Sequence, residues 1–145
     1  MKAPPPVLML LSILAAFGLD HLIPLPTSGA WMIWMGVLLV IGGFILAFLA
    51  VRQLYAAGTT IEPHGTVTAL VTGGPYGISR NPIYLAFLFI TIGLPMALGT
   101  LWGLLMAPLL IASLNYFVIR YEEAYLGRKF SGDYKDFKSR VRRWL

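Results

Sequence analysis

Cysteine is absent from this 145-residue chain, and charged residues make up only 12% of it. Without cysteine the protein has no disulfide, no thiolate nucleophile and no sulfur-ligated metal. Hydrophobic residues account for 58% of the chain, and its mean hydropathy is +0.77. A water-soluble globular domain is therefore a poor fit, and this composition indicates lipid as the main solvent.

Long apolar stretches predict an all-α integral membrane protein, with one domain over residues 1–145. We expect about four membrane spans, near residues 5–25, 30–51, 82–98 and 101–119. A helix over 30–51 would be about 33 Å long, and the hydrocarbon core of a bilayer is about 30 Å thick. The first span is the least certain, since Lys2 before a short apolar core is also typical of a secretory signal peptide.

Basic residues fall on a single side of this predicted topology. If both termini are cytoplasmic, all 11 Lys and Arg residues face the cytoplasm, and the opposite loops 20–29 and 99–100 contain none. The net charge of +5 is then explained by topology and by attraction to anionic lipid headgroups, and nucleic-acid binding is not expected. His21 and His64 should lie on opposite sides of the membrane, so we expect no metal site.

The last two predicted spans are separated only by Gly99-Thr100, which predicts an antiparallel helical hairpin. That hairpin brings the segment around Arg80 close to residues 120–123. The tail 120–145 is predicted to be an amphipathic cytosolic helix, broken near Ser131-Gly132-Asp133. Segment 52–81 has many Gly and Pro residues and is predicted to be an ordered loop, with a short strand over 68–71.

Polar residues stand at the entry to the third span, in the sequence SRNPIY at 79–84. Pro82 suits the first helical position, and Asn81 is a candidate N-cap. Arg80 conflicts with the positive end of the helix dipole unless an anion or carboxylate lies beside it. Glu122 and Glu123 are the candidate partners, so a structural ion pair and a ligand site both remain open.

Two linked motifs carry a family resemblance: TALVTGGPYGISRNPIY at 68–84 and, after the hairpin, EEAYLGRKFSGDYKDFKSRVRRWL at 122–145. Together they resemble the isoprenylcysteine carboxyl methyltransferase family, whose bacterial relatives are related to phospholipid methyltransferases. The resemblance covers roughly the last 85 residues. It implies an integral membrane enzyme that uses S-adenosylmethionine, held in a cytosol-facing site built from residues 66–84 and 120–145.

The resemblance also implies site residues. Arg80, Glu122 and Arg120 are the expected catalytic residues. The expected cofactor contacts are Thr68, Ala69, Leu70, Val71, Tyr76, Asn81, Pro82, Ile83, Tyr84 and Glu122. This chain departs from the family pattern at several positions: Asn81 stands where histidine is usual, Gly77 replaces a bulkier residue, and Val118 occupies the strict position of the substrate-binding arginine, which leaves Arg120 as its nearest counterpart.

Methyl transfer requires mainly that donor and acceptor are aligned and water is excluded. The expected acceptor is lipophilic, either a small molecule or a lipidated substrate carrying a carboxylate, thiol or amine, and it would enter from the membrane lipids. Two alternatives remain: a membrane reductase that binds NADPH on a related fold, and a lipid-binding scaffold without catalysis.

Overall fold

The computed structural model describes residues 4–25, 29–60 and 66–145; Lys2 and His64 lie outside these ranges. The described residues are helical or irregular and contain no strand. They form α1 (Pro5–Leu22), α2 (Ala30–Ala56), the short 3₁₀ helix η1 (Gly74–Gly77), α3 (Pro82–Ala97), α4 (Trp102–Leu114), the π-helical turn η2 (Asn115–Ile119) and α5 (Arg120–Arg140). The predicted all-α membrane fold is confirmed, whereas the strand expected over 68–71 is wrong.

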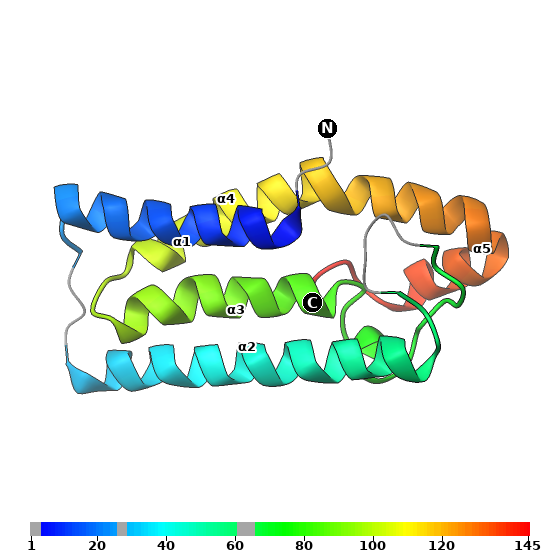
Figure 1. Cartoon of the computed structure of the whole chain (residues 1–145), viewed down its shortest axis with the longest axis horizontal. Coiled ribbons are helices and arrows are strands. Elements are labelled where there is room, and N and C mark those ends of the chain that lie inside the picture. Colours follow the sequence, from blue (N-terminus) through cyan, green and yellow to red (C-terminus); the bar gives the residue numbers. More distant parts are fainter. Residues whose placement is uncertain (1–3, 26–28, 61–65) are drawn as a thin grey trace.

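Four rods run alternately up and down the molecule (Figure 1). α3 lies between α2 on one side and α1 and α4 on the other, and α5 continues from α4 beyond the end of α3. The loop before α3 and helix α5 therefore gather at one end of the molecule, and the C-terminal segment runs back from α5 to the start of α3 (Figure 1). This arrangement confirms the predicted hairpin of the third and fourth apolar segments.

Three of the described helices are long and apolar enough to cross a membrane: Pro5–Leu22, Ala30–Ala56 and the continuous run Trp102–Arg140. α3 has 16 residues, or about 24 Å at 1.5 Å per residue, so it is shorter than these. Helices lie at each of the four predicted segments, but their ends differ from the predicted bounds, since α1 stops at Leu22 and α2 continues to Ala56.

Glycine lets α2 approach α3 closely. A β-carbon added at Gly93 would lie 2.7 Å from the carbonyl oxygen of Gly36 and 2.7 Å from Cβ of Leu39, and one at Gly43 would lie 3.0 Å from the carbonyl oxygen of Ala86. The other face of α2 is different, because a β-carbon at Gly42 would meet nothing within 4 Å. Close backbone contact between small residues is a common way of packing helices in lipid, where exclusion of water contributes little.

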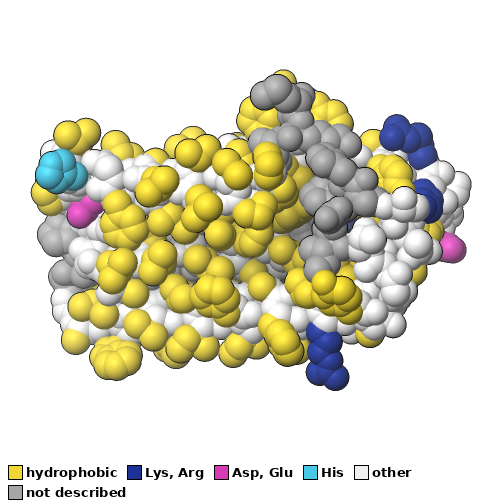
Figure 2. Space-filling view, in the orientation of Figure 1, with side chains coloured by type: hydrophobic (Ala, Val, Ile, Leu, Met, Phe, Trp, Pro, Cys, Tyr) yellow, Lys and Arg dark blue, Asp and Glu magenta, His cyan; other side chains and the backbone are white. Residues whose placement is uncertain are grey.

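Large apolar side chains cover the outside of the helical rods, among them Trp31, Leu38, Phe44 and Phe48 of α2. Figure 2 shows this apolar surface continuing along the molecule, with Lys and Arg gathered toward the α5 end. An extended apolar exterior with charge at one end is what a lipid-embedded protein requires.

Candidate functional site

A cavity of about 340 Å³ lies where the loop before α3 meets α5. Its wall contains Ala69, Leu70, Val71, Tyr76, Arg80, Asn81, Pro82, Ile83, Tyr84, Glu122, Glu123 and Tyr134, among others. Residues from both sequence motifs thus form one cavity, although about 40 positions separate them along the chain. Pockets of roughly 300–1,000 Å³ are typical for drug-sized ligands.

Tyr84 and Glu122 join the two motifs across the cavity wall. The Tyr84 hydroxyl donates a 2.7 Å hydrogen bond to Glu122 Oε1. Such a bond to an ionised carboxylate is stronger than one between neutral groups. Tyr84 is buried on the first turn of α3, and Glu122 lies on the first turn of α5, so this bond fixes how the two helices meet at the cavity.

Tyr76 lies on η1 and places its aromatic ring in the same wall. Burial, with a smaller contribution from the charge of Glu122, raises the pKa of Tyr76 above its ordinary value. The phenol therefore stays protonated near neutral pH. A neutral phenol offers a hydrogen-bond donor and an aromatic face without adding negative charge beside Glu122.

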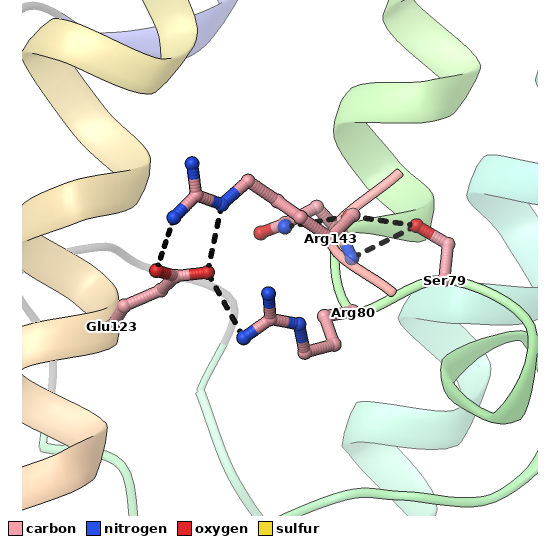
Figure 3. Close-up of polar contacts among 5 residues, drawn as sticks. Ser79, Arg80, Glu123 and Arg143 are labelled. Atoms are coloured by element: carbon pink, nitrogen blue, oxygen red, sulfur yellow. Dashed lines mark hydrogen bonds and ion pairs between the residues drawn. The ribbon is translucent and has the colours of Figure 1, made fainter. Parts of the chain in front are cut away.

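Glu123, the neighbour of Glu122, has another function: it binds two arginines (Figure 3). Arg143 donates to both of its carboxylate oxygens, at 3.0 Å from Nε and 2.7 Å from Nη2. Arg80 Nη1 lies 3.1 Å from Oε1. The sequence left Glu122 and Glu123 as alternative partners of Arg80, and the structure selects Glu123.

The C-terminal segment after α5 returns to the entry of α3 and holds it in place. The backbone N–H of Arg80 donates to the Arg142 carbonyl at 3.0 Å. The Arg143 carbonyl accepts hydrogen bonds from the Ser79 hydroxyl at 3.2 Å and from the Asn81 side-chain amide at 3.0 Å. Trp144 also packs against the core formed by α3 and α4. These hydrogen bonds hold the segment that carries Arg80 and Asn81 against the C-terminal tail.

Three sequence-based expectations need correction. Asn81 occupies the N-cap position of α3 but makes no side-chain capping bond, since its amide is engaged with the C-terminal segment. Thr68 does not line the cavity; it joins the loop to the end of α2 through Thr59 and Gly58.

Arg120 is the third correction. Its guanidinium is exposed, lies 4.0 Å from the ring centroid of Tyr116, and donates a 2.6 Å hydrogen bond to the Tyr121 hydroxyl. It is not among the cavity-lining residues. A guanidinium stacked on exposed aromatic rings is typical of an interfacial contact.

Sequence reasoning missed several parts of the wall: Pro5 and Pro6 at the start of α1, Leu54 near the end of α2, and Thr59. These residues carry no motif, and their presence depends on where α1 and α2 pack. Because three of the four are apolar, they add apolar surface to a wall that also carries polar residues of both motifs.

The phospholipid methyltransferase family matches residues 31–133, which is more than half of the chain and includes most of the cavity. The chain belongs to this family. Membership in the phospholipid methyltransferase family implies methyltransferase activity and agrees with the resemblance carried by the two motifs. An uncharacterized protein of Haemophilus influenzae (strain ATCC 51907 / DSM 11121 / KW20 / Rd) is 38% identical over 63 residues, covering 43% of this chain and 100% of that protein. No solved structure shows a significant match.

Within the described part of the chain, no group of three or more His, Asp or Glu residues is arranged to bind an ion.

Proposed function

We propose that this protein transfers a methyl group from S-adenosylmethionine to a lipophilic acceptor at the cytosolic face of a membrane. The observation that carries the proposal is the Tyr84–Glu122 hydrogen bond, because it joins the two family motifs around one cavity of about 340 Å³. The topology that accompanies it has both termini and the cavity on the cytosolic side, where the positive-inside rule places the basic residues.

The wall of the cavity suits this cofactor. Tyr76 and Tyr84 offer aromatic faces, and the Glu122 carboxylate can accept hydrogen bonds from an ammonium group or from ribose hydroxyls. Ala69, Leu70 and Val71 supply an apolar edge with nearby backbone groups. We assign these side chains, with Asn81, Pro82 and Ile83, to cofactor binding.

S-adenosylmethionine supplies an electrophilic methyl group on a sulfonium. The acceptor's lone pair forms the new bond to the methyl carbon while the carbon–sulfur bond breaks and its electrons remain on sulfur. The protein then has to hold the acceptor in line and exclude water. An amine acceptor must lose a proton, whereas a carboxylate or thiolate needs no base.

The apolar residues of the cavity wall favour an acceptor with a hydrocarbon part. Pro5, Pro6 and Leu54 come from the two helices whose outer surfaces are apolar. An acceptor dissolved in the bilayer would approach from this side, while the soluble cofactor would approach from the side of the loop and α5. Polar residues at the start of an apolar helix, as in segment 79–84, suit a site where a soluble cofactor meets an acceptor from the bilayer.

Calorimetric titration of the purified protein tests this proposal. We expect S-adenosylmethionine and its demethylated product, S-adenosylhomocysteine, to bind, and NADPH not to bind. The Glu122→Gln substitution should weaken product binding more than tenfold, or about 1.4 kcal/mol. The matched control is Asp136→Asn on the exposed face of α5, which should have no effect. Binding of NADPH alone would favour a reductase, and binding of none of the three would favour a scaffold.

A further inference from the structure

We infer that Arg80 forms an oxyanion subsite inside the cavity and binds a carboxylate or phosphate group of the bound molecule. This inference rests on the proposed function, which supplies the molecules that carry such groups. Arg80 lines the cavity immediately before α3, next to Asn81 and Pro82. The cofactor contacts proposed for Glu122 and Tyr76 leave Arg80 without an assigned ligand.

The charges around Arg80 do not balance. Glu123 is one carboxylate shared by two guanidiniums, and Arg143 takes both of its oxygens in a bidentate arrangement. Arg80 retains a single ion contact, from Nη1 to Oε1 at 3.1 Å. The three side chains together therefore carry an excess positive charge (Figure 3).

Burial makes this excess charge costly. The Arg80 side chain is only 9% exposed; its Nε atom is buried and makes no hydrogen bond to the described part of the protein, and its Nη1 atom has only the ion contact with Glu123. These two nitrogens carry most of the guanidinium's N–H bonds. A buried guanidinium that shares its carboxylate with a second arginine and keeps an unused N–H donor destabilises a protein unless a further acceptor joins it.

The position of Arg80 adds to the case for an anion. The first turn of α3 presents backbone N–H groups and the positive end of the helix dipole near the guanidinium. Glu122, the other carboxylate in the wall, accepts the hydrogen bond from Tyr84. One wall thus carries a negative group and an excess positive group, which suits a zwitterionic ligand.

Two ligands of the proposed reaction carry an oxyanion. The methyl donor has an α-carboxylate, and a phospholipid acceptor has a phosphate. A guanidinium binds both through the same paired N–H···O hydrogen bonds. In either case Arg80 binds an oxyanion through its guanidinium. Ligand pairs that differ only in the oxyanion can show whether it belongs to the methyl donor or to the acceptor.

The experiment measures binding to the wild-type protein and to Arg80→Gln in detergent by calorimetry. One ligand pair is S-adenosylhomocysteine and its decarboxylated analogue. The other pair is dihexanoyl phosphatidic acid and dihexanoylglycerol, which differ only in the phosphate. Arg128→Gln is the matched control, because Arg128 is exposed on α5 and does not line the cavity.

We expect Arg80→Gln to weaken binding of one oxyanion-bearing ligand at least tenfold and to change binding of its counterpart less than twofold. An effect within the first pair assigns the subsite to the donor's carboxylate, and an effect within the second assigns it to a phosphate. Equal effects within both pairs, or no effect beyond that of Arg128→Gln, would overturn the inference.

If Arg80→Gln does not fold, binding to the wild-type protein alone still tests the inference. The wild-type protein should bind the oxyanion-bearing member of one pair at least tenfold more tightly than its counterpart, and equal affinities within both pairs would contradict the subsite. Failure of the proposed function looks different. In that case wild-type protein binds neither S-adenosylmethionine nor its product, while the lipid pair still reports on Arg80.

Discussion

Adjacent residues on α5 have separate functions at the cavity. Successive positions on a helix point about 100° apart, so Glu122 faces Tyr84 while Glu123 faces Arg80 and Arg143. The chemistry of the two side chains is the same, and only direction distinguishes them. Sequence alone left both as partners for Arg80, because a pair of consecutive glutamates does not reveal which one turns toward which neighbour.

Tyr84→Phe tests the bond that joins the two motifs. The ring stays in the wall, but Glu122 loses the donor that lies 2.7 Å from its carboxylate oxygen. We expect binding of S-adenosylhomocysteine to weaken about tenfold, since hydrogen bonds to charged groups contribute roughly 1.5–3 kcal/mol. Calorimetry provides the measurement. Tyr55→Phe, at an exposed position on α2, is the control; equal affinities for the two variants would show that the bond does not organise the cavity.

Glu123→Gln tests the ion-pair cluster. Removing this charge leaves two guanidiniums close together with no carboxylate between them, and breaking a buried pair costs about 3–5 kcal/mol. We expect a clearly lower melting temperature in thermal unfolding, while Asp136→Asn should melt like the wild type. A Glu123→Gln variant of unchanged stability would mean that solvent already screens the cluster.

At the scale of elements, helix bounds could be predicted well where the chain carries local signals. Pro82 at the start of α3 and Gly99-Thr100 between α3 and α4 are such signals, and both predictions are confirmed. The predicted break in the tail is also confirmed: within α5, Ser131 has a positive φ of 40°.

The return of residues 141–145 to the entry of α3 could not be predicted. It depends on the carbonyl groups of Arg142 and Arg143, and every residue carries such a group. Asn81 was misassigned as a cap for the same reason: its side-chain partner comes from more than 60 positions away. Contacts made by backbone atoms across the fold leave no pattern in the sequence.

A pair of alanine substitutions tests the close packing of α2 on α3. Gly36→Ala would force a β-carbon to within 2.7 Å of the Gly93 carbonyl oxygen, whereas Gly42→Ala meets nothing within 4 Å. Overpacking costs about 1–3 kcal/mol, and glycine-to-alanine exchange within a helix otherwise gains roughly 0.5–1 kcal/mol. Thermal unfolding should show Gly36→Ala destabilised and Gly42→Ala unchanged or slightly stabilised. The reverse order would refute this helix contact.

At the scale of the whole molecule, the two ends of the helical rods differ in charge. Among the described residues, Lys and Arg lie toward the α5 end, and the end with the 98–101 turn carries none (Figure 2). The predicted topology therefore places the cavity in the cytosol, next to the soluble cofactor, and the apolar surface of α2 in lipid.

The absence of cysteine allows this topology to be tested with single labels. Leu98→Cys lies on an exposed site at the turn between α3 and α4, and Ser139→Cys lies on an exposed site of α5. A maleimide that cannot cross membranes should label Leu98→Cys in spheroplasts and Ser139→Cys only in inverted vesicles. Labelling of both variants from one side would contradict the proposed crossing pattern.

The central claim is that two distant stretches of chain form one site for the methyl donor. Hydrogen–deuterium exchange with and without S-adenosylhomocysteine tests it most directly. The account predicts that the ligand slows exchange in both 67–84 and 120–126, and that Glu122→Gln reduces the effect in both. Slower exchange in only one stretch, or in neither, would contradict it.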